Sequence, residues 1–116
     1  MNPKTTEERP WGCFTILYES NETKIKMLNI KSNSVLSLQR HNHRSEHWTV
    51  ISGKVTIQVG EDKKILEQKH TAYVPQGEWH RIWNDTKEEA HIVEIQTGSY
   101  FGEDDIERKE DVYGRV

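Results

Sequence analysis

The sequence predicts an all-β protein, folded as one small barrel or jelly roll, on two main observations. First, short runs alternate apolar and polar residues with the period of two that is typical of strands, as in residues 24–31 (KIKMLNIK) and 55–59 (VTIQV). Second, about eight such runs follow one another closely, and almost no stretch has a helical period. Many short strands in a small domain favour a barrel or jelly roll over an α/β fold.

Length and composition indicate one domain without a nucleic-acid or membrane partner. A chain of 116 residues is long enough for a single hydrophobic core. The net charge of −3 comes from 16 basic and 19 acidic residues spread along the chain, so no basic stripe suggests nucleic acid. No apolar run approaches the roughly 20 residues of a membrane helix, and residues 1–12 lack the apolar stretch of a secretory signal. With Cys13 as the single cysteine, we expect a cytoplasmic protein.

The strands follow in chain order from the alternation. Residues 24–31 form the first, and residues 34–41 (SVLSLQRH) the second. Residues 46–60 predict a hairpin that turns at Ser52-Gly53, since serine-glycine is a turn signal between apolar runs. The remaining strands are expected at residues 64–68, 70–75, 80–85 and 91–98. The acidic tail, residues 100–116, is expected to form a short helix or a strap across the barrel.

Residues 39–48 (QRHNHRSEHW) crowd possible metal ligands into ten positions. Residues two apart in a strand share a face, which leaves two overlapping ligand pairs, Gln39 with His41 and His41 with His43. We expect a turn at Arg44-Ser45, followed by a strand with Glu46 and alternate residues on one face. A second candidate lies in residues 75–84 (PQGEWHRIWN), where a proline and a glycine bend the chain into a strand that carries His80 inward.

These two segments resemble the two motifs of the cupin superfamily. The first motif begins with two ligands separated by one residue. After three or four further residues comes a glutamate, and after six more a glycine. Gln39, His41, Glu46 and Gly53 fit this spacing, whereas the pair His41/His43 lies too close to Glu46. The second motif, P-x-G-x(2)-H-x(3)-N, is matched in full by residues 75–84, with His80 as the ligand. The resemblance implies a metal held by Gln39, His41, Glu46 and His80.

Two imidazoles and two oxygen donors suit one divalent ion, for which we expect zinc, with manganese, cobalt, nickel and iron as alternatives. Gln39 is the weakest member of this set, because an amide is a poor ligand and can instead hydrogen-bond a bound water.

Further motifs resemble the carboxy-terminal cupin domain of the bifunctional mannose-6-phosphate isomerase/mannose-1-phosphate guanylyltransferase family. They are RPWG at residues 9–12, LSLQ at 36–39, HxHRxEHW at 41–48, GEDDI at 102–106 and DxYGR at 111–115. The resemblance covers residues 1–116 as one cupin jelly-roll domain, with a barrel core at 20–98 and family-specific segments at 1–19 and 99–116. The glycine-rich nucleotide loop of the family is absent, so nucleotide transfer is not expected.

The resemblance implies an aldose–ketose isomerase that converts mannose 6-phosphate to fructose 6-phosphate. Such a reaction needs a base near neutral pKa and a cation beside the developing enediolate. His43 is the first candidate for the base, because it neighbours the ligands, and His47 is the second. The arginine fork suits the phosphate, and the candidates are Arg44, Arg81, Arg9 and Arg115. The acidic residues at 103–105 are expected to form a solvated loop.

Two other functions fit the same motifs. A non-catalytic sugar-phosphate-binding cupin or partner subunit would keep the ligands and lose the base. An iron-dependent cupin dioxygenase is a further alternative, although Gln39 stands where such sites usually place a histidine. In each case the edge strands and apolar outer face of a barrel lead us to expect a homodimer.

Overall fold

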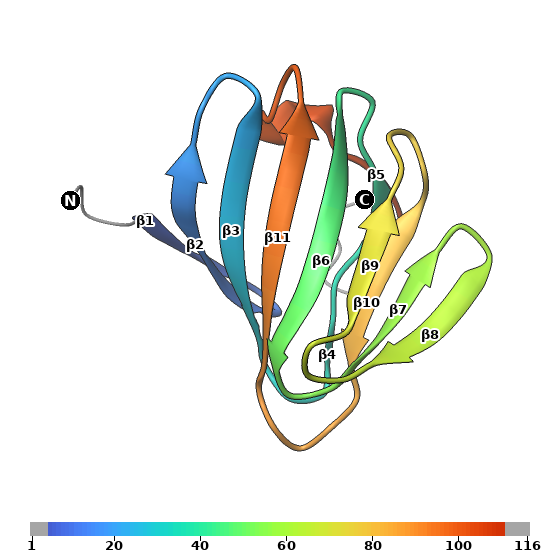
Figure 1. Ribbon diagram of the computed structural model, residues 1–116. Coiled ribbons are helices and arrows are strands. Elements are labelled where there is room, and N and C mark those ends of the chain that lie inside the picture. Colours follow the sequence, from blue (N-terminus) through green and yellow to red (C-terminus); the bar gives the residue numbers. More distant parts are fainter. Residues whose placement is uncertain (1–4, 111–116) are drawn as a thin grey trace.

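Two antiparallel sheets face each other in the computed structural model, which describes residues 5–110 (Figure 1). The strands and the single 3₁₀ turn of that part of the chain are β1 (Thr5–Arg9), β2 (Gly12–Glu19), β3 (Thr23–Ile30), β4 (Ser34–Val35), β5 (Leu38–Arg40), β6 (Arg44–Ser52), β7 (Val55–Val59), β8 (Asp62–Leu66), β9 (Thr71–Val74), β10 (His80–Asn84), β11 (Ala90–Gly98), η1 (Glu103–Asp105) and β12 (Glu107–Glu110). The predicted all-β fold is confirmed for this part of the chain.

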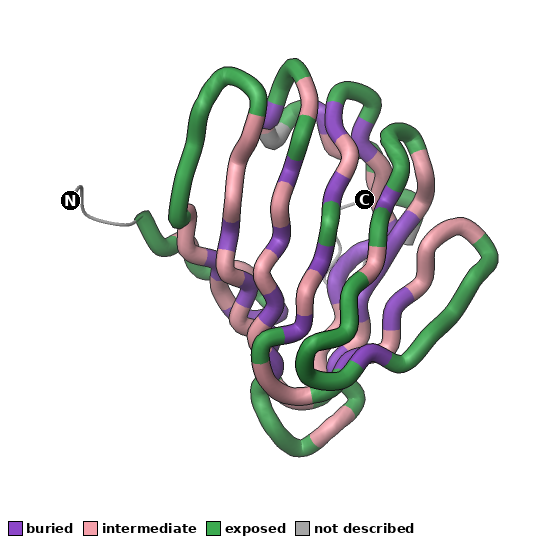
Figure 2. The backbone as a smooth tube through the Cα atoms, viewed as in Figure 1, coloured by how far each residue is buried: buried purple, intermediate pink, exposed green. Residues whose placement is uncertain are grey.

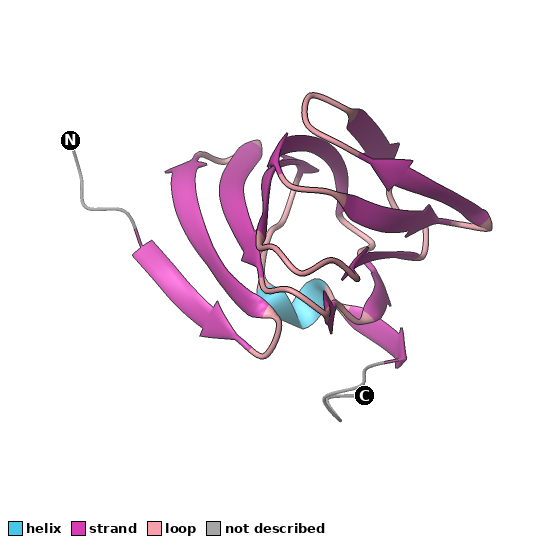
Figure 3. Ribbon diagram, turned by 90° about the horizontal axis from the view of Figure 1, so that it is seen from below, coloured by secondary structure: helices cyan, strands magenta, loops and turns pink. Residues whose placement is uncertain are grey.

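The first sheet has the strand order β1-β2-β3-β11-β6-β9, and the second has the order β12-β5-β10-β7-β8, with β4 paired to β10. Seen from below, the strands curve around an enclosed interior, with η1 at its margin (Figure 3). Within residues 5–110, no helix has the length and apolar character to cross a membrane.

The interior is built by strands that bury every second side chain. In β6 the buried residues include Glu46, Trp48 and Val50, while His47 and Ile51 are exposed, as the alternation predicts. Figure 2 shows the same alternation of burial along β6 and β11. The buried apolar side chains of both sheets form one cluster, in which Ile57 and Ile92 are almost wholly inaccessible to solvent. The polar side chains that share this inner face are therefore forced into the barrel interior.

The hairpin predicted for residues 46–60 is wrong. β6 pairs with β11 and β9 in the first sheet, whereas β7 pairs with β10 and β8 in the second. The chain does turn near Gly53, whose φ of +84° favours glycine, and an added Cβ there would lie 2.9 Å from the Glu89 carbonyl oxygen. Both edges of β6 are already paired, so the chain crosses to the other sheet after the turn.

The terminal segments contribute strands as well. β1 and β2 extend the first sheet through residues 5–19, ahead of the predicted core at 20–98. The tail was predicted over residues 100–116, of which residues 111–116 lie outside the described part. Within residues 100–110 the chain forms the short 3₁₀ turn η1 and the edge strand β12, which pairs with β5. This pairing brings the end of the described chain beside the candidate ligands.

Candidate metal centre

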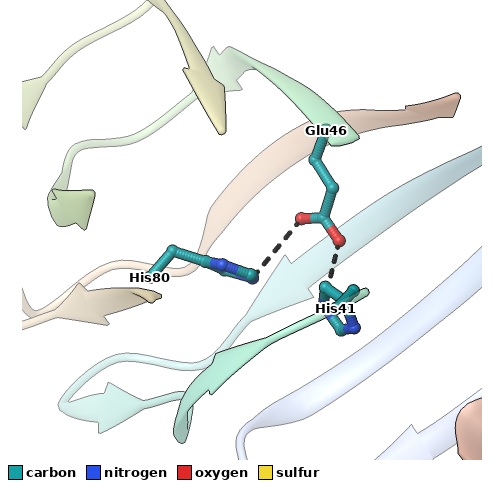
Figure 4. Close-up of side chains that lie close together, drawn as sticks. All are labelled: His41, Glu46 and His80. Atoms are coloured by element: carbon teal, nitrogen blue, oxygen red, sulfur yellow. Dashed lines mark ion pairs between the residues drawn. The ribbon is translucent and has the colours of Figure 1, made fainter. Parts of the chain in front are cut away.

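His41, Glu46 and His80 converge inside the barrel (Figure 4). The Glu46 Oε2 atom lies 3.2 Å from His41 Nε2, and its Oε1 atom lies 3.7 Å from His80 Nε2. All three side chains are buried, and their ligand atoms lie within 4.8 Å of one another. Three donors at this spacing, two imidazoles and a carboxylate, are the set that a divalent transition metal prefers.

Both sheets supply this cluster. Glu46 projects inward from β6 in the first sheet, and His80 begins β10 in the second. His41 directly follows β5, whose Gln39 is the pairing partner of His80. The turn predicted at Arg44-Ser45 lies two residues earlier, because the chain bends at Asn42 and His43 before β6 begins at Arg44.

Backbone carbonyls orient both imidazoles. His41 Nδ1 lies 3.0 Å from the carbonyl oxygen of Asp105, and His80 Nδ1 lies 3.0 Å from that of Glu78. A carbonyl oxygen only accepts hydrogen bonds, so each Nδ1 carries the proton. The Nε2 lone pairs are then left to face Glu46, which is the tautomer that metal coordination requires.

The charges of the cluster also suit a cation. Burial alone would raise the pKa of Glu46, but the adjoining imidazoles of His41 and His80 and the charge of Arg44 hold it well below its usual value. Burial lowers the pKa of His80 below its usual 6.5, against the opposing effect of Glu46. At neutral pH the site therefore presents a carboxylate and a neutral imidazole.

The Arg44 guanidinium contacts two of these ligand atoms. Its Nε donates to Glu46 Oε2 at 3.2 Å, and its Nη2 lies 3.1 Å from His41 Nε2. A metal ion bound to His41 Nε2 would use the lone pair that Nη2 now faces, so Arg44 has to yield at this position. With that adjustment the three donors fit one divalent ion. The structure also leaves Arg44 Nη1 buried without a hydrogen-bond partner among the described residues.

Gln39, the fourth predicted ligand, is half-buried and lines a pocket that Glu46 and His80 also line. Its side-chain Nε2 donates to Ser37 Oγ at 3.1 Å. The backbone of Gln39 is paired with that of His80 on the adjacent strand. Its role as a ligand stays a prediction.

A second buried carboxylate, Glu94, adjoins the cluster and was missed by the sequence analysis. Trp48 Nε1 lies 3.1 Å from Glu46 Oε1 and 3.2 Å from Glu94 Oε1, so one indole bridges the two carboxylates. Gln96 Nε2 donates to Glu94 Oε2 at 2.7 Å. Burial, followed by the charge of Glu46, raises the pKa of Glu94 to about 7. The period-two alternation of residues 91–98 was the available signal, because it places Glu94 on the same face as Ile92.

The pocket around these carboxylates is rich in positive charge. Its lining includes Glu46 and Glu94 together with five cationic residues: Arg9, Lys26, Arg44, Arg81 and Arg108. The predicted phosphate ligands Arg9, Arg44 and Arg81 are thus brought to one cavity, while Arg115 lies outside the described residues. Arg108, from β12, was not predicted. This excess of cations in a buried pocket favours an anionic ligand.

The two predicted bases lie away from this pocket. His43 keeps 55% of its side chain exposed, and its Nδ1 lies 3.0 Å from Asp105 Oδ1. His47 is exposed on the outer face of β6, with its ring centroid 4.6 Å from that of Tyr73. Neither residue lines the pocket. Their catalytic roles stay predictions, and among the described residues Glu94 is nearer to the ligand cluster.

Asp105 is buried, although residues 103–105 were expected to form a solvated loop. Its carboxylate accepts hydrogen bonds from the backbone N–H groups of Asn42, at 3.1 Å, and His43, at 2.9 Å. Burial works against ionisation, but these hydrogen bonds and the His43 side chain hold the pKa of Asp105 below its usual 3.8. They also explain why the chain bends at residues 42–43. The signal was hidden, because no local pattern links residues so far apart in the sequence.

The chain matches the family described as mannose-6-phosphate isomerase C-terminal over residues 2–111. It is 42% identical to the xanthan biosynthesis protein XanB of Xanthomonas campestris over 93% of this chain and 23% of that protein. It is also 42% identical to the alginate biosynthesis protein AlgA of Pseudomonas aeruginosa, and 36% identical to the mannose-1-phosphate guanylyltransferase ManC of Salmonella typhimurium, in each case over 93% of this chain and 22% of the relative. The chain thus spans about a fifth of the length of these relatives.

Solved structures confirm the fold. A double-stranded β-helix protein from Klebsiella pneumoniae superposes with a TM-score of 0.73 at 20% identity, covering 84% of this chain and 83% of that one. The capsular polysaccharide assembling protein CapF of Staphylococcus aureus gives a TM-score of 0.80 at 16% identity, covering 96% of this chain and 35% of that one. The cupin domain of Schizosaccharomyces pombe Cnp3 gives 0.72 at 15% identity, covering 74% and 60%.

The function predicted from the sequence, isomerisation of mannose 6-phosphate, has to be corrected. Where the names of these relatives state a reaction, it is that of a mannose-1-phosphate guanylyltransferase, and this chain matches only about a fifth of each relative. The comparisons therefore support a cupin-like domain related to enzymes of sugar phosphate metabolism, and they give no specific support to isomerase activity.

Proposed function

Because the chain belongs to the family of mannose-6-phosphate isomerase carboxy-terminal domains, we propose that it is a metal-binding cupin domain that holds a sugar phosphate. One observation carries this proposal: Glu46 and His80 of the ligand cluster line a pocket that also has five cationic side chains in its lining. The ligand cluster suits a divalent ion, and the cationic lining suits an anionic sugar.

The metal in this proposal is one divalent ion, with zinc as the first choice. Two imidazoles and one carboxylate suit zinc, and a sugar oxygen or a water molecule would complete its coordination. When bound, such an ion supplies a positive charge that polarises sugar hydroxyl or carbonyl oxygens. Manganese, cobalt, nickel and iron accept the same donors and belong in the same test.

The residues of the chain have separate tasks toward the sugar phosphate. The guanidinium groups around the pocket bind phosphate oxygens, for which the planar fork is suited. Glu94, with its pKa of about 7, can hold or release a proton at Oε1 or Oε2 near neutral pH, and so can accept hydrogen bonds from sugar hydroxyls. Trp48 fixes Glu94 relative to Glu46 through its indole N–H.

The relatives suggest the setting in which this binding is used. ManC is named for the transfer of a guanylyl group to mannose 1-phosphate, so the proposed ligand is a phosphorylated hexose of that pathway class. We extend the proposal to a cytoplasmic location and to a homodimer.

Titration calorimetry on chelator-treated protein tests the proposal. We expect one zinc ion to bind per chain, and mannose 1-phosphate or mannose 6-phosphate to bind the metal-loaded protein more tightly than unphosphorylated mannose does. His80→Ala should abolish tight metal binding, whereas His70→Ala, on the exposed turn before β9, should not. Failure of folded wild-type protein to bind any divalent metal, or equal binding of mannose and its phosphates, would refute the proposed function.

A further inference from the structure

Arg108 sits in one row with the candidate ligands. In the second sheet, Arg108 of β12 is the pairing partner of Gln39 in β5, and Gln39 is the partner of His80 in β10. Residues paired across antiparallel strands project on the same face of the sheet. With strands about 4.8 Å apart, the backbone of Arg108 lies roughly 10 Å from that of His80. The row therefore runs from the metal centre to a cation at the edge strand.

The Arg108 side chain lacks a partner for one of its buried donors. It lines the same pocket as Glu46 and His80, and its Nε is buried without a hydrogen-bond partner among the described residues. Buried polar groups are almost always hydrogen-bonded, so this unpaired guanidinium donor in the pocket indicates a missing acceptor.

The chemistry of that acceptor follows from the charges. The pocket lining has five cationic side chains against the two carboxyl groups of Glu46 and Glu94, and a bound anion would balance this excess of positive charge. A phosphate monoester carries two negative charges near neutral pH and several acceptor oxygens, which match fork-shaped donors. In a sugar phosphate, hydroxyl groups at one end of the carbon chain can reach the metal while the phosphate at the other end reaches Arg108.

We propose that Arg108 forms the phosphate-binding end of the pocket and takes the phosphate monoester of the bound sugar phosphate. This inference rests on the proposed function, because it assigns the phosphate end of the same pocket. It also gives β12 a role in the site: the strand pairs with β5 and carries the anchor to the pocket wall.

Arg40→Gln is a matched control for Arg108→Gln. Arg40 lies next to Gln39 in β5 but faces outward, where it pairs with Glu107 at 2.7 Å and keeps 36% of its side chain exposed. Both variants remove one positive charge from the same pair of strands. Only Arg108→Gln removes a donor from the pocket.

The experiment titrates mannose 6-phosphate, mannose 1-phosphate and inorganic phosphate into zinc-loaded protein and follows the phosphorus resonance by NMR. We expect Arg108→Gln to weaken binding of a sugar phosphate about tenfold or more, since the hydrogen bonds it removes join two charged groups. Affinity for zinc should stay within about twofold of wild type. Arg40→Gln should bind both ligands like wild type, and Arg108→Lys, which keeps the charge but loses the fork, should fall between.

The outcomes separate this inference from the proposed function. If wild-type protein binds no sugar phosphate, the proposed function fails. If wild type binds but Arg108→Gln binds equally well, the phosphate assignment of Arg108 is overturned. It is also overturned if Arg108→Gln and Arg108→Lys both lose zinc affinity together with ligand affinity, because Arg108 would then support the metal centre.

Discussion

His41 Nδ1 lies 3.0 Å from the backbone carbonyl oxygen of Asp105, although the two residues are 64 positions apart in the chain. The carboxylate of the same Asp105 holds the backbone of residues 42 and 43. One residue in η1 therefore fixes both the ring of a candidate metal ligand and the turn that follows it. The candidate metal centre is coupled to the C-terminal segment of the described chain.

This coupling predicts that Asp105→Asn weakens metal binding. An asparagine presents one oxygen and one N–H₂ group, so one of the two backbone donors would face another donor and the turn would shift. Loss of a group that orients a metal ligand typically costs 10–100-fold in metal affinity. We expect a loss of this size for zinc, measured by calorimetry or by competition with a chelating dye.

Asp104→Asn is the control for this prediction, because Asp104 is exposed and its carboxylate accepts a hydrogen bond from Tyr100 at the surface. It should bind zinc like wild type. Equal zinc affinity of Asp105→Asn and wild type would show that the turn keeps its geometry without the carboxylate.

The contrast between His41 and Asp105 illustrates how far the sequence alone leads. Alternation along β6 predicted that Glu46, Trp48 and Val50 share the buried face, because a strand enforces that pattern locally. The resemblance to the cupin motifs picked out Gln39 together with His41, Glu46 and His80, and the last three do converge. The pairing of β6 and β7 with other strands, and the contribution of Asp105, depend on packing between distant segments. No local pattern encodes such contacts.

Glu94 and Arg108 were missed for a related reason. Glu94 is one charged residue in an otherwise ordinary strand, and Arg108 lies in a strand of charged residues, ERKE. Charged residues in strands normally face solvent. Their inward orientation becomes visible only when β11 and β12 are placed against neighbours that also carry polar groups inward. A sequence-based search for polar residues on the inward face of β11 would have found Glu94, because its alternation with Ile92 is regular.

The raised pKa of Glu94 predicts that stability falls as pH rises. The carboxyl has a pKa of about 7 in the folded protein, mainly through burial, against an ordinary value of 4.5. Between these values the folded state keeps a proton that the unfolded chain has lost, so the free energy of unfolding decreases with pH until about pH 7. The contribution of Glu94 to stability is thus complete below about pH 4.5 and is lost above about pH 7.

Glu94→Gln should remove this dependence. In chelator-treated protein, we expect the variant to resemble wild type near pH 4.5 and to gain stability relative to it toward pH 8, by on the order of 3 kcal/mol at most. Urea unfolding across this range measures the effect, and Glu67→Gln, at an exposed position, serves as the control. A constant difference between Glu94→Gln and wild type at every pH would contradict the prediction.

Burial in the core predicts that alanine substitution lowers the free energy of unfolding more at Ile92 than at Ile65. Ile92 in β11 is fully buried, whereas Ile65 in β8 is 59% exposed. Ile92→Ala removes buried methyl groups and leaves a cavity, so it should lower the free energy of unfolding by about 2–5 kcal/mol. Ile65→Ala should change it by less than about 0.5 kcal/mol. Similar values for the two variants would mean that the inner face of β11 is not packed as described.

The outer face of the first sheet carries the last prediction, that of a homodimer. Tyr73 of β9 is 51% exposed and Ile51 of β6 is 43% exposed, and β9 is an edge strand of its sheet. Apolar side chains beside an open edge are a surface that a second copy would cover. Light scattering after size exclusion should give twice the mass of one chain.

Tyr73→Glu should give a monomer that still binds zinc, because Tyr73 faces away from the pocket. Tyr18→Glu, at an exposed tyrosine on β2, should remain a dimer. A monomeric wild-type protein, or a dimer that survives Tyr73→Glu, would exclude this face as the interface.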